Sequence, residues 1–153
     1  MKYIFLIITV FFLLQQDALS ENILDEFLVA DENMLDPRFK KTVIILFHHN
    51  QEGATGLVVN KPIKTMSIVE LFEISNLTPP KDIIDKDITL YWGGPVEHGQ
   101  FFFIHSSDYK SDDLISSNNN FMITQKPEVL IDIAKNQGPK KYFAFRCYVY
   151  TDG

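Results

Sequence analysis

The stretch Asp36–Pro62, DPRFKKTVIILFHHNQEGATGLVVNKP, decides the fold of this chain. It contains two apolar runs, Thr42–Phe47 and Thr55–Val59, whose β-branched side chains favour extended structure. The segment between them, His48–Gly53, is polar and rich in turn-forming residues. Two apolar runs joined by a short polar segment that contains glycine are typical of a β-hairpin. The stretch therefore predicts a pair of antiparallel strands near the start of a domain.

Outward from this hairpin, short apolar runs alternate with turn residues. These runs predict further strands over Phe27–Ala30, Ile88–Trp92, Gln100–His105, Phe121–Thr124 and Tyr142–Tyr150. One helix is expected after Ser67, where Glu70 completes a capping box, and another after Pro127, with an end near Gly138. Two helices cannot supply a crossover for every strand. We therefore expect a single compact α/β (α+β) domain with a mixed, largely antiparallel sheet.

Composition and charge limit the function. A chain of 153 residues with 46% hydrophobic residues is suited to one globular domain. Its net charge of −6 provides no broad positive field for nucleic-acid phosphates, which argues against direct binding to DNA or RNA. Cys147 is the single cysteine, so no intramolecular disulfide can form. Its aromatic surroundings predict a small buried side chain instead of a reactive thiol.

The first residues have the layout of a secretory signal peptide. Lys2 is followed by the uncharged apolar run Tyr3–Leu14, and the small residues Ala18 and Ser20 precede an expected cleavage site. The run is short for a membrane span of about 20 residues.

We therefore expect residues 1–20 to be a signal peptide or an unused leader, and residues 21–153 to form the domain. Cleavage would make the protein exported or periplasmic, with no stable membrane span left, whereas an unused leader would leave it cytoplasmic.

Three residues are the candidates for catalysis, His49, His105 and Asp36, with Ser106 beside the second histidine. They would suit a hydrolase or a metal-dependent enzyme. The sequence has neither an HExxH nor a GxSxG motif, and the adjacent His48 and His49 would point to opposite faces of a strand. The Asp-Pro pair also fits the first two positions of a type I turn. The sequence thus predicts no catalytic residue, metal site or cofactor.

Four polar residues at the ends of the two hairpin strands are candidate binding residues, namely Arg38, Asn50, Asn60 and Lys61. The alternative is that they serve turns and solvated loop ends. The segment Gly93–Pro95 follows a strand and lacks the pattern of a phosphate-binding loop, so we interpret it as a tight turn.

Several segments together resemble the AlgH/YqgE-type family of small bacterial proteins: Phe27–Ala30, Asp36–Phe39, His48–Pro62, Leu90–Val96, Ile104–Tyr109 and Gly138–Lys141. The similarity runs from about Phe27 to Gly153. It implies a compact α/β domain with a mixed sheet and a proposed role in regulating transcription. The family has no settled activity or cofactor, so it provides no catalytic residues to carry over.

The chain departs from the family pattern at both ends. Family members begin close to the first strand and are expected in the cytoplasm, so the apolar leader sets this chain apart. They also continue past the last strand into a further helix, and we therefore expect the domain of residues 21–153 to be truncated at its C-terminus. The predicted function is a non-enzymatic binding or regulatory protein that contacts a protein partner, with a role in regulating transcription.

Overall fold

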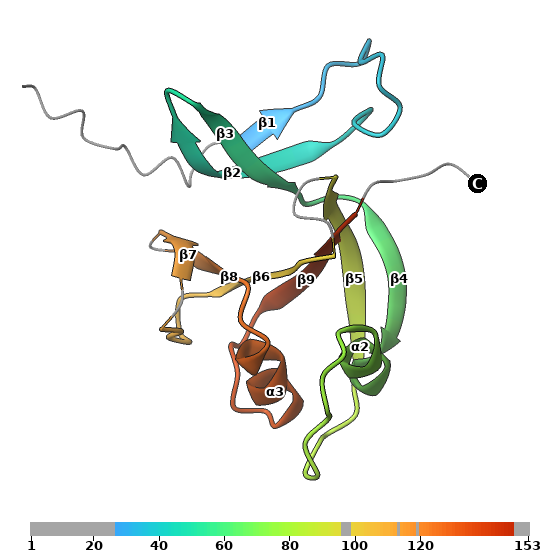
Figure 1. Cartoon of the computed structure of the whole chain (residues 1–153), viewed down its shortest axis with the longest axis vertical. Helices are drawn as coiled ribbons and strands as arrows, with labels where there is room; N and C mark the ends of the chain where they lie inside the picture. The colour runs from blue at the N-terminus through green and yellow to red at the C-terminus, as the bar shows by residue number, and fades with distance from the viewer. Residues whose placement is uncertain (1–26, 96–98, 113, 119, 149–153) are drawn as a thin grey trace, which may run out of the picture.

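The computed structural model describes residues 27–95, 99–112, 114–118 and 120–148. Within these residues, nine strands and two helices form one α+β domain with two sheets (Figure 1). This confirms the predicted fold class, although two sheets replace the single expected one. The expected leader, residues 1–20, and residues 149 and 150 of the last expected strand lie outside the described residues.

The strands fall into a small sheet and a large sheet. The small one, sheet A, has the order β1-β2-β3, and the large one, sheet B, has the order β4-β5-β9-β6-β8-β7. The strands are β1 Phe27–Val29, β2 Val43–Asn50, β3 Gly53–Val58, β4 Pro62–Ser67, β5 Asp87–Gly94, β6 Phe101–Ser106, β7 Leu114–Ser117, β8 Phe121–Thr124 and β9 Tyr142–Cys147. Strands β5 and β9 are parallel, and every other pair is antiparallel, as the prediction of a mixed, largely antiparallel sheet required.

The predicted hairpin forms sheet A together with β1. Strand β2 continues to Asn50 and β3 begins at Gly53, so the polar segment His48–Gly53 is mostly strand, and only Gln51 and Glu52 lie between the two strands. The histidines stay in the strand because a tight turn follows, in which the Asn50 Oδ1 atom accepts bonds from the amides of Glu52 (2.8 Å) and Gly53 (3.2 Å). A bulge between Leu46 and His48 adjusts the register before this turn.

Two strands of sheet B were not predicted, β4 and β7, and they are its two edges. Strand β4 begins at Pro62, a residue that an edge strand tolerates in its first position. Strand β7 is short and lies in a polar part of the chain that is rich in serine and asparagine. Both are mostly exposed, so they lack the apolar run that marks a buried strand.

The pair Gly93 and Gly94 belongs to β5, so the interpretation of Gly93–Pro95 as a tight turn was wrong. A Cβ atom on Gly93 would lie 2.8 Å from the Cys147 Sγ atom and 3.0 Å from the Leu57 Cδ2 atom. Glycine is therefore needed where sheet A packs against sheet B. Cys147 is buried there, as its surroundings predicted.

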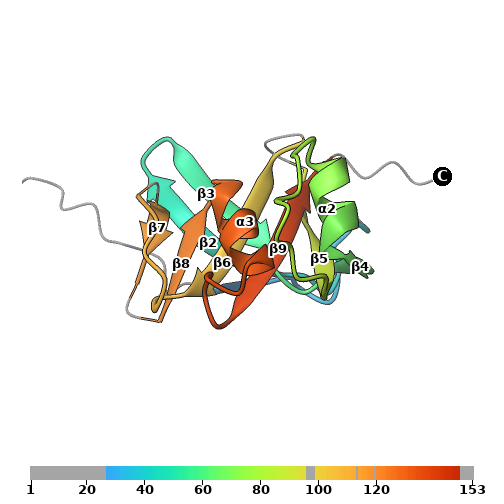
Figure 2. The same cartoon turned by 90° about the horizontal axis from the view of Figure 1, so that it is seen from below.

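The two helices are short and lie at the positions predicted from the sequence. Helix α2 is Ile68–Ile74, and its N-cap Ser67 Oγ accepts a bond from the Glu70 amide at 3.2 Å. The Glu70 carboxylate binds Lys64, so only half of the expected capping box forms. Helix α3 is Glu128–Ala134 and ends before Gly138. Both helices cover the same face of sheet B, as Figure 2 shows from below.

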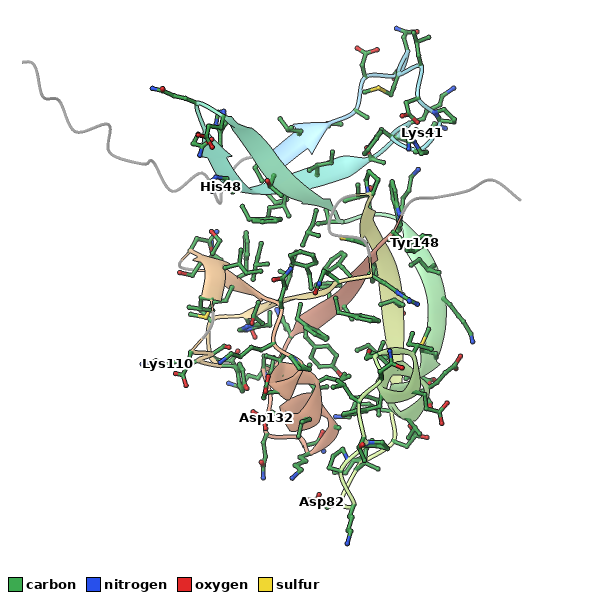
Figure 3. The ribbon with its side chains drawn as sticks, in the orientation of Figure 1. Lys41, His48, Asp82, Lys110, Asp132 and Tyr148 are labelled. Atoms are coloured by element: carbon green, nitrogen blue, oxygen red, sulfur yellow. The ribbon has the colours of Figure 1, made fainter. Side chains whose placement is uncertain are left out.

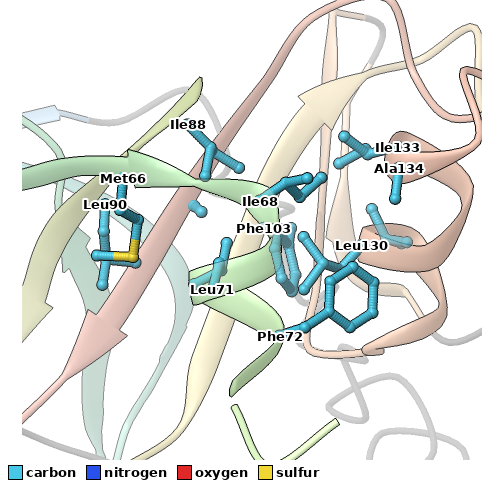
Figure 4. Packing of buried hydrophobic residues seen from close by; sticks show 12 residues of the cluster. Met66, Ile68, Leu71, Phe72, Ile88, Leu90, Phe103, Leu130, Ile133 and Ala134 are labelled. Carbon is cyan, nitrogen blue, oxygen red and sulfur yellow. The ribbon is translucent and has the colours of Figure 1, made fainter. Parts of the chain in front are cut away.

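Side-chain alternation divides the core between the two faces of sheet B. On β6, Phe103 packs in the cluster that both helices cover, whereas Phe102 packs with residues of sheet A. Figure 4 shows the first cluster, in which Phe72 and Leu71 of α2 meet Leu130 of α3. Sheet A, sheet B and the helices thus form successive layers, and the candidate sites lie at the margins of the contact between the two sheets.

Candidate functional site

One open cavity of about 510 Å³ lies beside the turn Asp36–Phe39. We name it the Arg38 cleft, and its lining residues are Pro37, Arg38, Asn60, Lys61, Pro62, Ile63, Trp92 and Tyr148. It lies where the exit from sheet A passes into the first strand of sheet B. Figure 3 shows Lys41 and Tyr148 on this side of the molecule and His48 at the other end of the hairpin.

An ion pair stabilises the turn that forms one wall of the cleft. The Arg38 Nη2 atom lies 2.6 Å from the Asp36 Oδ2 atom, and the Arg38 Nε atom lies 3.0 Å from Oδ1. The side-chain hydrogen bond from Arg38 holds the pKa of Asp36 below its ordinary value. The carboxylate therefore stays ionised and the pair stays intact until the pH falls through that lowered pKa.

Lys61 is held in the cleft by two contacts. Its Nζ atom donates a hydrogen bond to the Arg38 carbonyl oxygen, and it lies 5.5 Å from the centre of the Trp92 ring. The Trp92 ring is itself buried, and its Nε1 atom donates to the Tyr148 carbonyl oxygen at 2.9 Å. The ammonium group thus has a fixed position over an aromatic face.

The Asn60 side chain links the end of β3 to the backbone at the start of β2. Its Oδ1 atom accepts a bond from the Val43 amide at 2.8 Å, and its Nδ2 atom donates to the Lys41 carbonyl at 2.9 Å. Of the four candidate binding residues, the structure brings Arg38, Asn60 and Lys61 together. Asn50 is not near them in the fold, because it closes the turn at the far end of the β2–β3 hairpin.

The three catalytic candidates lie on different elements. His49 is exposed on β2 opposite Ala54, Asp36 binds Arg38 in the turn before β2, and His105 is buried on β6 of sheet B. Across residues 27–95, 99–112, 114–118 and 120–148, no group of three or more His, Cys, Asp or Glu side chains could hold a metal ion. The described geometry does not assemble a catalytic triad from these residues.

His105 instead packs against the loop that leads away from β6. Its Nδ1 atom donates to the Ser106 carbonyl oxygen at 3.0 Å, and its ring lies edge-on to Tyr109, with 5.4 Å between the ring centres. The Tyr109 hydroxyl donates to the Asp132 Oδ2 atom of helix α3 at 2.6 Å. Burial, followed by the bond to Asp132, raises the pKa of Tyr109 to about 12.

We expect the Tyr109→Phe variant to lose about 1 kcal/mol of unfolding free energy, because one hydrogen bond to a carboxylate disappears. The free phenol titrates at pH 10.0 and the folded one at about 12. The contribution is therefore complete below pH 10 and is lost as the pH rises through 12. Urea unfolding of both proteins at pH 8 and pH 12 checks this. A difference in stability that stays constant over this range would contradict it.

A second cavity, of about 380 Å³, lies between the two sheets and is mostly apolar. We name it the Phe143 groove, and its lining residues are Phe27, Ile45, Val59, Ile104, His105, Ser106, Asn120, Phe121, Lys141, Phe143 and Phe145. Phe27 and Phe143 are 54% and 51% exposed at its margin. Alternation along β6 directs Ile104 toward the groove and the His105 ring toward the helices, where Tyr109 contacts it.

Strand β1 extends this apolar surface. It is an outer strand of sheet A, in which Leu28 and Val29 are 49% and 74% exposed. Val29 lies on the same face of the strand as Phe27, and Leu28 lies on the opposite face. Contiguous exposed apolar side chains are typical of interaction surfaces. Sequence reasoning did not single out Phe27 or Phe143, nor Trp92 in the Arg38 cleft. The one available signal was the aromatic run of β9, which has large apolar side chains on both faces of the strand.

The fold and these two cavities define a small α+β domain with two surface sites and no assembled catalytic group among the described residues. None of the described helices is long and apolar enough to cross a membrane. A family model described as AlgH-like matches residues 27–150. The chain belongs to this AlgH-like family, which confirms the family resemblance.

Relatives and a solved structure agree with this assignment. A UPF0301 protein of Cereibacter sphaeroides is 36% identical over 73% of this chain and 60% of its own length. One from Rickettsia rickettsii is 33% identical over 81% of this chain and 65% of its own length. The solution structure of the AlgH protein from Pseudomonas aeruginosa matches with a TM-score of 0.61 and 32% identity, over 80% of this chain and 64% of that protein. The match thus spans less than two thirds of these relatives.

Proposed function

We propose that this domain is a non-enzymatic binding protein that contacts a protein partner through the Phe143 groove and strand β1. The observation that carries the proposal is the exposure of Phe27 and Phe143 at the margin of one apolar cavity, next to the exposed Leu28 and Val29 of strand β1. Burying apolar surface yields about 25 cal/mol per Å², so a partner that covers these side chains gains affinity from them.

The charge of the domain supports a protein partner more than a nucleic acid. The net charge is −6, and the rim of the groove contains one basic side chain, Lys141, among its described lining residues. A role in regulating transcription, which the family resemblance implies, would then operate through a protein contact. The alternative enzyme built on His49, His105 and Asp36 has no comparable observation in its favour, because these residues lie on separate elements.

Photo-crosslinking in cells tests the groove directly. A photoreactive phenylalanine analogue at position 143 or 27 should yield covalent adducts with one protein of defined mass. The same analogue at Ile84, which is 48% exposed on the loop before β5, is the matched control and should not yield that adduct. Equal adducts at all three positions, or none at positions 27 and 143, would overturn the proposal.

We also propose that the protein is exported, on the basis of the apolar run and the small residues that precede Glu21. Cells that produce the full chain with a C-terminal tag should yield a periplasmic or secreted product whose intact mass corresponds to a start at or near Glu21. Such a product could not control transcription by direct contact. A cytoplasmic product that keeps residues 1–20 would refute export.

A further inference from the structure

We propose that the Arg38 cleft binds a small organic anion, namely a carboxylate attached to an apolar or aromatic body. The cleft and the Phe143 groove share no lining residue among those described, so this site is separate from the proposed protein contact. The cavity of about 510 Å³ lies within the range of roughly 300–1,000 Å³ that is usual for small-molecule sites.

The charge of the cleft selects an anion with a single negative charge. Its described lining includes two cations, Arg38 and Lys61, and no carboxylate. Asp36 neutralises the charge of Arg38 through its bidentate contact with the guanidinium group. One net positive charge thus remains, in a domain whose overall charge is −6. A monoanion matches this local charge better than a dianion does.

Lys61 is positioned before any ligand arrives. Its ammonium group has three N–H donors, and the Arg38 carbonyl oxygen accepts one of them among the described contacts. The Trp92 ring lies 5.5 Å from the Lys61 Nζ atom and supports the ammonium group from one side. Since the side chain is already held, less rotamer entropy is lost when it binds a carboxylate.

The remaining walls favour an apolar body on the ligand. Pro37, Pro62 and Ile63 contribute ring and aliphatic carbon atoms, and Ile63 is 41% exposed. Proline has no backbone N–H group, so two of these residues offer no main-chain donor to a second anionic group. A ligand with one carboxylate and a flat or branched apolar body fits both the cation and these walls.

The chain provides its own reporter for this site, because Trp92 is its single tryptophan and lines the cleft. We would titrate the full chain at low salt with benzoate and with benzamide, its neutral isostere, and follow the tryptophan fluorescence. The expected result is saturable benzoate binding at millimolar concentrations, with benzamide at least tenfold weaker. Added salt should weaken the binding of benzoate more than that of benzamide.

Two variants locate the interaction. Lys61→Met removes the charge and keeps the length of the side chain, and it should weaken benzoate binding at least tenfold. Lys64→Met is the matched control on β4, where Lys64 is exposed and binds Glu70, and it should leave binding unchanged. Circular dichroism verifies the fold of each variant. If Lys61→Met fails to fold, the comparison of benzoate with benzamide on the native chain still tests whether the cleft binds an anion. Equal affinity for both ligands, no response to benzoate, or full binding by folded Lys61→Met would overturn the proposal.

Discussion

Replacement of Phe72 by alanine is expected to lower the free energy of unfolding by about 3–5 kcal/mol. Phe72 is fully buried at 0% exposure, in the cluster that joins α2 to α3 and to sheet B (Figure 4). The variant loses the transfer free energy of the ring and leaves a cavity among rigid neighbours. Since small domains are stable by about 5–15 kcal/mol, this single change removes a large part of the total.

The same chemical change at Phe143 is the control for this prediction. Phe143 is 51% exposed, so Phe143→Ala should cost less than about 1 kcal/mol. Urea unfolding followed by circular dichroism measures both variants. Equal losses would show that the helix-covered cluster is not the main core. The contrast also separates two roles of phenylalanine in this domain, because Phe72 stabilises the core and Phe143 is exposed for the proposed contact with a partner.

Replacement of Gly56 by alanine should destabilise the domain by about 1–3 kcal/mol, near the upper end of that range. A Cβ atom at this position would lie 2.6 Å from the Ile45 carbonyl oxygen and 2.7 Å from the Ile44 Cγ2 atom. The carbonyl is main chain and belongs to β2, so it cannot move aside without disturbing the pairing of β2 with β3. The clash must therefore be relieved by distorting the hairpin.

Ala54→Ser, on the same strand, is the control for Gly56→Ala. Ala54 is exposed opposite His49, and this substitution should change the stability by less than about 0.5 kcal/mol. Thermal unfolding gives the stability of each variant, and amide hydrogen exchange should show faster exchange across β2 and β3 in the glycine variant alone. A melting temperature for Gly56→Ala equal to that of the native chain would refute the steric argument.

The elements that local sequence signals predict were found close to the expected positions. The hairpin was visible because its strands are apolar runs with a turn between them, and α2 was visible because Ser67 caps a helix with an apolar face. The edge strands β4 and β7 were missed because their own residues are mostly exposed. Only hydrogen bonds to β5 and β8 make them strands.

The candidate sites were less accessible to sequence reasoning. The sequence indicated Arg38, Asn60 and Lys61 as polar residues near strand ends, but nothing local showed that Trp92 and Tyr148 would close a cavity around them. The Phe143 groove was even harder to predict, because its walls come from β1 and from β9, the first and last strands of the described chain. Contacts between residues so distant in the chain depend on how the two sheets pack.

By itself, the sequence determined the α+β class, the hairpin, both helices, the burial of Cys147 and the membership of the AlgH-like family. Those features depend on the periodicity of apolar residues, on caps and on turns, which act over a few neighbouring residues. The tertiary structure alone decided that there are two sheets, that β4 and β7 are strands, and that the Arg38 cleft and the Phe143 groove exist. These depend on hydrogen bonds and packing between distant segments, which no short stretch of sequence encodes.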